Sequence, residues 1–149
     1  MEFLRLLEEI RTPLFNAIFQ FFTLFGEETL FMVFAMVFFW CVDKKSGYFL
    51  LYVSFLGGTI NQFLKLIFCI PRPWVLDKKF TIVESARNAA TGYSFPSGHT
   101  QSAAGLFFGT ARIRKEVWLR IACVVITLLV AFSRMYLGVH TPADVLVSL

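Results

Sequence analysis

The chain has 149 residues, of which 57% are hydrophobic and only 16% are charged, and its mean hydropathy is +0.68. A soluble domain usually contains about 45–50% apolar and about 25% charged residues. The composition therefore excludes an ordinary soluble domain and predicts an integral membrane protein with a single domain. The net charge of +4 is small and scattered along the chain, which argues against a nucleic acid partner.

The first part of the chain contains two uncharged stretches that are separated by Glu27 and Glu28. Each stretch is shorter than the ~20 residues that cross a bilayer as one helix. We expect residues 1–25 to form a pair of interfacial or re-entrant helices. The first membrane span is then expected at about residues 27–42.

Further apolar stretches predict an all-α, polytopic transmembrane helical bundle. Gly105 and Gly109 have the spacing that lets helices approach closely, although two incidental glycines explain the pair equally well. The helix that begins near Pro142 would be only about 12 Å long against ~30 Å of hydrocarbon, so we expect a truncated chain. The expected spans after the first are 46–70, 96–111 and 117–137, with a further span starting at 142–149.

The loops give the orientation. The two short connections at residues 43–45 and 112–120 hold six Lys or Arg, whereas the longer loop at 71–95 holds four. Positively charged short loops stay in the cytoplasm. The end of the second span, the start of the third and the end of the fourth then share the extracytoplasmic face. Each of these three places carries a cluster of ionisable residues, which are functional candidates at a membrane edge.

The first cluster places Lys65 and Arg72 seven residues apart, which is about two helical turns, or roughly 10 Å, on nearly the same face. Pro71 and Pro73 are expected to end the helix and fix the backbone around Arg72. An ammonium and a guanidinium that converge from one face suit a dianion such as phosphate. The alternative is that Lys65 snorkels to the interface and Arg72 binds lipid headgroups.

The second cluster, Ser97-Gly98-His99, follows Pro96 and is expected to open a helix. Free N–H groups and the positive end of the helix dipole attract phosphate, and Gly98 permits a close approach. His99 lies in the first turn, where it could donate a proton to a leaving oxygen. A lone histidine near a helix start is otherwise a cap or a surface residue.

The third cluster contains a candidate nucleophile. Arg134 lies in an apolar run, and Thr141, Pro142 and Asp144 match the N-cap, N1 and N3 positions of a helix. This pattern holds His140 just before the helix with Asp144 nearby. A carboxylate bonded to one ring nitrogen leaves the other nitrogen free to attack phosphorus. Asp144 could also be only a capping residue, and the two roles are compatible.

Together, the three motifs resemble the signature of the type 2 phosphatidic acid phosphatases, KxxxxxxRP, PSGH and SRxxxGxHxxxD, and every signature position is present in residues 65–144. The resemblance implies the helical bundle shared with vanadium haloperoxidases and glucose-6-phosphatase, and hydrolysis without metal or cofactor. It makes His140 the nucleophile, Asp144 its orienting partner and His99 the general acid. The residues it implies for phosphate binding are Lys65, Arg72, Ser97, Gly98 and Arg134.

The sequence therefore predicts a multi-pass enzyme of the cell membrane that hydrolyses a lipid phosphomonoester or diphosphate at the extracytoplasmic face. Two other functions are compatible with the sequence: a vanadate-dependent haloperoxidase, and a non-catalytic protein that binds or transports anions. An anion-binding or transport protein needs the cations but not the paired histidines, so a structure in which His99 and His140 lie far apart would favour that hypothesis.

Overall fold

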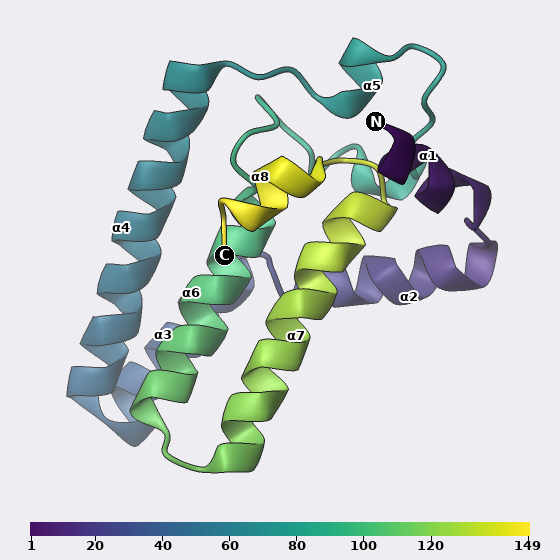
Figure 1. Cartoon of the computed structure of the whole chain (residues 1–149). Coiled ribbons are helices and arrows are strands. Elements are labelled where there is room, and N and C mark those ends of the chain that lie inside the picture. Colours follow the sequence, from purple (N-terminus) through teal and green to yellow (C-terminus); the bar gives the residue numbers. More distant parts are fainter.

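The computed structural model describes all 149 residues and contains helices and no strands, which confirms the predicted all-α class. Three long helices run side by side, α4 (Lys44–Phe68), α6 (Gly98–Ile113) and α7 (Val117–Tyr136) (Figure 1). Helix α6 packs extensively on both α4 and α7. It is therefore the central helix of the bundle, and the residues at its N-terminus lie between its two neighbours.

The N-terminal part adds three helices, α1 (Glu2–Glu9), α2 (Pro13–Leu24) and α3 (Glu28–Val37), the last continued by a π-helical turn at Phe38–Val42. Helix α2 packs on α7, and α3 packs on α4 and α6. The chain bends by 46° between α2 and α3. At this bend, a Cβ on Gly26 would lie only 2.7 Å from the carbonyl oxygen of His99, so the bend sits directly against the start of α6.

By length and apolar composition, two helical stretches could cross a membrane, Lys44–Leu76 and Val117–Tyr136, and the bent pair α2–α3 could be a third. The expected span at 96–111 corresponds to α6, which has 16 residues and is therefore about 24 Å long, shorter than the ~30 Å of hydrocarbon. The outward side chains of the long helices are apolar: Phe55 is 75% and Trp118 is 70% exposed. Such exposure suits lipid rather than water.

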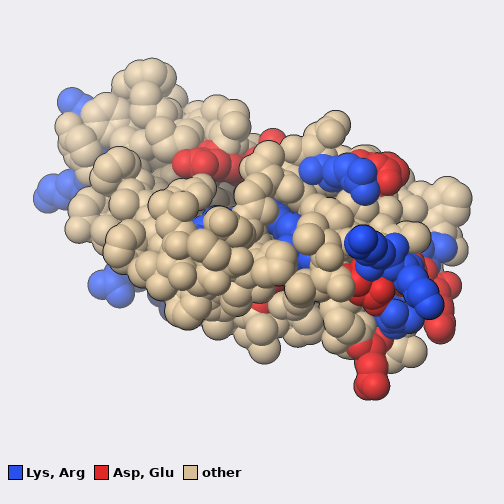
Figure 2. Space-filling model, turned by 90° about the horizontal axis from the view of Figure 1, so that it is seen from above, with Lys and Arg blue, Asp and Glu red and all other residues tan.

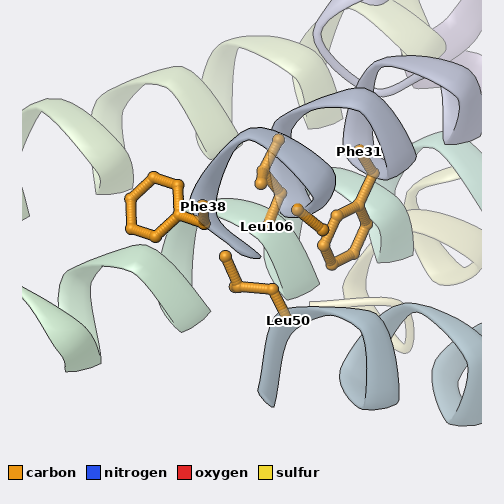
Figure 3. Packing of buried hydrophobic residues seen from close by; sticks show 5 residues of the cluster. Phe31, Phe38, Leu50 and Leu106 are labelled. Carbon is orange, nitrogen blue, oxygen red and sulfur yellow. The ribbon is translucent and has the colours of Figure 1, made fainter. Parts of the chain in front are cut away.

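Close helix packing forms the core at the end away from the predicted site. A Cβ on Gly109 would lie 2.8 Å from Cδ2 of Leu50, so α4 and α6 approach each other where the glycine spacing predicted a close contact. Beside this contact, Phe31 and Phe38 from the α3 segment pack on Leu50 of α4 and Leu106 of α6 (Figure 3). These apolar contacts fix α3, α4 and α6 relative to one another.

The segment between α4 and α6 folds back over the opposite end of the bundle, together with the short helices α5 (Pro73–Leu76) and α8 (Pro142–Leu146) and a 3-10 turn at Glu84–Ala86 (Figure 1). Phe80 of this segment packs on Leu4 and Leu7 of α1. Ala86 is buried against the chain that follows α7. The expected polar loop at 71–95 is therefore a packed cover, and it brings backbone carbonyl groups to the candidate site.

Candidate active site

His140 follows α7 and precedes α8, where the chain turns sharply. Gly138 has φ +81°, a left-handed conformation that glycine adopts without strain. Thr141 then caps α8: its Oγ1 accepts the Asp144 amide at 3.3 Å, and its own amide donates to Oδ2 of Asp144 at 2.8 Å. This capping box confirms the predicted helix start. It holds Oδ2 of Asp144 3.5 Å from Nδ1 of His140.

The surroundings of His140 fix its protonation. Its side chain is 2% exposed, and its Nε2 lies 3.0 Å from Nη1 of Arg72. A guanidinium only donates hydrogen bonds, so Nε2 accepts and the ring proton lies on Nδ1, toward Asp144. Burial lowers the pKa of His140 to about 3, with Arg134 and Arg72 acting in the same direction and Asp144 opposing them. The imidazole is therefore neutral at neutral pH, with its lone pair on Nε2.

Arg72 reaches the site differently from the sequence prediction. Helix α4 ends at Phe68, and Cys69 adopts a left-handed conformation with φ +45°. Arg72 therefore lies beyond the helix, not two turns along one face of it. The side chains of Lys65 and Arg72 nevertheless converge, because both donate hydrogen bonds to the backbone at residues 91–93. Nζ of Lys65 donates to the carbonyl of Tyr93 at 3.0 Å. Arg72 donates to the carbonyl of Gly92 at 3.1 Å and to the carbonyl of Thr91 at 2.7 Å.

The start of α6 supplies His99. The helix begins at Gly98, as the sequence predicted for the segment Ser97-Gly98-His99. Ser97 is its N-cap, and Oγ of Ser97 lies 3.4 Å from the amide of Thr100 and 2.9 Å from Oγ1 of Thr100. The Ser97 amide donates to the carbonyl of Asp144 at 3.1 Å, which ties α6 to α8. Nε2 of His99 is buried and has no hydrogen-bond partner. An unpaired buried ring nitrogen is costly unless a ligand meets it.

A cavity of about 180 Å³ joins these groups. Five of the eight predicted site residues line it: Lys65, Arg72, Gly98, His99 and His140. Figure 2, seen from the end that carries α8, shows Lys and Arg atoms recessed in the middle of this face, while other charged groups project around the rim. The two histidines and two cations therefore face one small space, whereas Ser97, Arg134 and Asp144 are not among the residues that line it.

Arg134 is completely buried. Its Nη1 donates to Oγ1 of Thr23 at 2.7 Å, but Nε and Nη2 have no partner. The carbonyl of Arg134 also accepts the amide of His140 at 3.3 Å, so the residue adjoins the candidate nucleophile through the backbone. Unpaired donors on a buried guanidinium are suited to a phosphate oxygen.

Sequence reasoning missed several polar residues of the cavity. Asn61 and Gln62 form a polar pair one turn before Lys65 in an apolar helix. Polar residues in such a helix indicate a functional site, so the sequence alone could have pointed to them. In the sequence, Glu28 only marked a boundary between two apolar stretches, whereas in the structure Glu28 lines the cavity. The other polar residues that line the cavity and were not predicted are Ser54, Thr91, Gln101 and Ser102. No group of three or more His, Cys, Asp or Glu side chains forms a candidate metal site.

Comparison with known proteins decides the family. The model of the PAP2 superfamily matches residues 46–149, which is more than half of the chain and contains all three motifs. The chain belongs to the PAP2 superfamily. Within it, undecaprenyl-diphosphatase BcrC of Bacillus subtilis is 38% identical over 94 residues, which are 62% of this chain and 45% of the relative. The chain thus spans less than half the length of that relative.

Solved PAP2 structures share the fold. The crystal structure of Aquifex aeolicus LpxE superposes with a TM-score of 0.83 at 25% identity, over 99% of this chain and 86% of that one. The first transmembrane PAP2 type phosphatidylglycerolphosphate phosphatase from Bacillus subtilis gives 0.79 at 26% identity, over 97% and 74%. These neighbours, together with the apolar long helices, establish a membrane-embedded helical bundle of the PAP2 type.

Proposed function

We propose that this PAP2 protein hydrolyses a lipid phosphomonoester or diphosphate through a phosphohistidine formed on His140. The observation that carries the proposal is the state of His140: a neutral, buried imidazole whose Nε2 lone pair lies 3.0 Å from a cation, while Asp144 faces the other ring nitrogen. His99 lines the same cavity. A protein that only bound anions would need the cations but no such pair of histidines.

In the proposed first step, Lys65 and Arg72 bind the phosphoryl oxygens. The phosphate competes for the Arg72 guanidinium and releases the lone pair on Nε2 of His140. His99 takes up a proton when the phosphate dianion binds beside it. Nε2 of His140 then attacks phosphorus, the bond from phosphorus to the leaving oxygen breaks, and His99 gives that proton to the leaving oxygen. Asp144 stabilises the positive charge that the imidazole acquires. The unpaired N–H groups of Arg134 stabilise the charge that develops on the transferred group.

In the proposed second step, water attacks the phosphorus of the phosphohistidine. His99, now neutral, takes the proton from the water, and the bond between Nε2 and phosphorus breaks. Inorganic phosphate leaves, and His140 is again neutral with its proton on Nδ1. Both steps use only side chains of this chain, so the proposed mechanism requires no metal-activated water.

The names of the relatives support a lipid substrate. One is an undecaprenyl-diphosphatase and another a phosphatidylglycerolphosphate phosphatase. The position of the site at one end of an apolar bundle supports the same substrate class, because a lipid can keep its chains in the bilayer while its headgroup enters the cavity. The positive loops at 43–45 and 112–120 support a site on the extracytoplasmic face of the cell membrane.

The test is phosphate release by the purified full chain in lipid nanodiscs. The substrate panel contains phosphatidate, phosphatidylglycerol phosphate, undecaprenyl diphosphate and a sphingoid phosphate. We expect the wild type to release phosphate from at least one of them. His140→Asn should lower that rate by more than about 1,000-fold, as expected for a missing nucleophile. Tight binding of these lipids without phosphate release, or near wild-type release by His140→Asn, would refute the proposal.

A further inference from the structure

The cavity has a second end that the proposed phosphate chemistry does not use. Beyond the cations and the histidines, its wall is polar, and Ala89 is the one hydrophobic residue in the whole lining. An apolar wall would be expected if the cavity held only the hydrocarbon part of a lipid next to the phosphate. The side chains of this second end, which we call the polar end, are Glu28, Ser54, Asn61, Gln62, Gln101 and Ser102.

Two residues of the polar end are buried without using their hydrogen-bonding groups. Asn61 is 4% and Ser102 is 9% exposed, and neither side chain is hydrogen-bonded to another part of the chain. Neither residue contributes an enclosed polar atom without a partner, and both line the cavity, so their polar atoms are open to the cavity and available to a ligand. Oδ1 of Asn61 lies 3.8 Å from the place that a Cβ on Gly98 would occupy. Asn61 therefore adjoins the start of α6, beside the phosphate-binding end.

A pair of glycines in α4 makes room for the polar end. A Cβ on Gly57 would lie 2.1 Å from Nε2 of Gln101, and a Cβ on Gly58 would lie 3.8 Å from Oε1 of Glu28. The side chain of Gln101 thus lies against the bare backbone of α4 at Gly57, and the exposed side chain of Glu28 lies beside Gly58. Glu28 reaches this place because α3 begins directly after the bend that follows α2.

The two ends of the cavity differ in charge. Gly58, beside the Glu28 carboxylate, precedes Lys65 by two turns of α4, which is about 10 Å along the helix axis. A carboxylate only accepts hydrogen bonds. The group that meets Glu28 must therefore be a donor, either a hydroxyl or an amine, and a second phosphate at this place would be repelled.

The direction of the reaction connects the two ends. In an in-line displacement, the leaving oxygen lies on the side of phosphorus opposite His140, where His99 protonates it. Gln101 and Ser102 line the same cavity as His99. Polar side chains are therefore available in that cavity to the carbon atoms attached to the leaving oxygen.

We propose that the polar end recognises a hydroxyl or amino group on the alcohol part of the substrate, close to the phosphate. This inference rests on the proposed function. It narrows the substrate class to phosphomonoesters of hydroxylated or aminated lipids, in preference to prenyl diphosphates and to plain alkyl phosphates.

The test compares four substrates with purified full-length protein. Three are phosphomonoesters of equal chain length: an unsubstituted alkyl phosphate, its 2-hydroxy derivative and its 2-amino derivative. The fourth is a prenyl diphosphate. We expect kcat/KM of the wild type to be at least about fivefold higher for one of the substituted esters than for the plain ester, the size of one added hydrogen bond. Preference for the hydroxy ester identifies a hydroxyl ligand, and preference for the amino ester identifies an amine.

Variants test whether the polar end causes this preference. Asn61→Ala should reduce the ratio of the two kcat/KM values to near one. Gly57→Ala should also reduce it, because its Cβ displaces Gln101. Thr59→Ala is the matched control on the same helix: Thr59 is exposed and does not line the cavity, so this variant should keep the wild-type ratio. Glu28→Gln keeps an acceptor but loses the charge. It should therefore lower kcat/KM for an amino ester by about tenfold, the size of a charge-assisted hydrogen bond, and should change a hydroxy ester less.

Three results would overturn the inference: equal kcat/KM for the three esters in the wild type, an equal loss for all three esters in Asn61→Ala, or faster hydrolysis of the prenyl diphosphate than of every ester. Failure of the proposed function gives a different result. In that case the wild type hydrolyses none of the four substrates, or it hydrolyses them at a rate that does not depend on His140.

Discussion

Replacing Asp144 with asparagine should slow phosphoryl transfer to His140 by about 10- to 100-fold. Oδ2 of Asp144 lies 3.5 Å from Nδ1 of His140, and its negative charge stabilises the imidazolium that forms when Nε2 attacks. A hydrogen bond to a charged group is worth about 1.5–3 kcal/mol, and about 1.4 kcal/mol corresponds to a tenfold change in rate. Because 3.5 Å is longer than an ordinary hydrogen bond and Nδ1 of His140 has no hydrogen-bond partner in the free protein, we expect a loss within this range and not above it.

The structure separates this effect from a loss of folding. Asparagine keeps a side-chain oxygen that can accept the Thr141 amide, so the cap of α8 should survive. Ser94→Ala is the matched control: Oγ of Ser94 donates to the same oxygen of Asp144, but its hydroxyl is not hydrogen-bonded to His140. That variant should lose about 1 kcal/mol of stability and much less of the rate.

The assay is single-turnover formation of the phosphoenzyme by rapid quench, with a radiolabelled substrate taken from the lipid panel. Thermal unfolding of each variant, measured in the same detergent, shows whether the fold is intact. The reasoning fails if Asp144→Asn forms the phosphoenzyme at the wild-type rate. It also fails if Ser94→Ala slows the reaction as much as Asp144→Asn does.

Three further predictions follow from the proposed mechanism and the orientation. Hydrolysis should survive chelation by EDTA and be inhibited by vanadate, a mimic of the trigonal-bipyramidal transition state; loss of activity on chelation and its return with a divalent metal would contradict the mechanism. Single cysteines at Lys79 and Lys115, with Cys41, Cys69 and Cys123 replaced, should differ in reaction with an impermeant thiol reagent on intact cells. Only position 79 should react, and labelling of position 115 alone would invert the topology. Burial lowers the pKa of His140 to about 3, so the neutral form of His140 persists in acid. Phosphoenzyme formation from a substrate with a good leaving group should therefore continue at about pH 5. A fall in the rate of phosphoenzyme formation with a midpoint near the ordinary histidine pKa of about 6.5 would contradict this.

The sequence predicted the parts of the site that short-range interactions determine. The starts of α6 and α8 follow from Ser97 and Thr141, because a capping side chain satisfies amides only two or three residues away. Gly138, which adopts a left-handed conformation without strain, lets the chain turn before His140. Both histidines could therefore be placed at the ends of helices before any tertiary contact was known.

The approach of Arg72 could not be predicted in this way. Pro71 indicated that the helix ends nearby, but nothing local indicated that Cys69 would adopt the left-handed conformation, which few residues other than glycine adopt. The direction of the chain after α4 depends on the packing of the following segment on α1 and α7. Lys65 and Arg72 meet because that segment returns over the site, not because seven residues separate them.

The polar end of the cavity was missed because its residues come from three helices. Glu28, Asn61 and Gln101 are far apart in the sequence, and each alone has an ordinary explanation at a span boundary or on a helix face. Their proximity depends on the bend between α2 and α3 and on the contact of Gln101 with the bare backbone of Gly57. Both are tertiary features, for which a single sequence provides no periodic signal.

The central claim is that His140 carries the phosphoryl group, and mapping the covalent intermediate tests it most directly. The full-length protein is mixed with a radiolabelled lipid phosphate, quenched within milliseconds in alkaline denaturant, digested, and analysed by mass spectrometry under conditions that preserve phosphohistidine. We predict one phosphorylated peptide, with the phosphoryl group on His140, labile in acid and absent from His140→Asn. A phosphoryl group on another residue would contradict the account, as would rapid phosphate release by a wild type that never becomes labelled at His140.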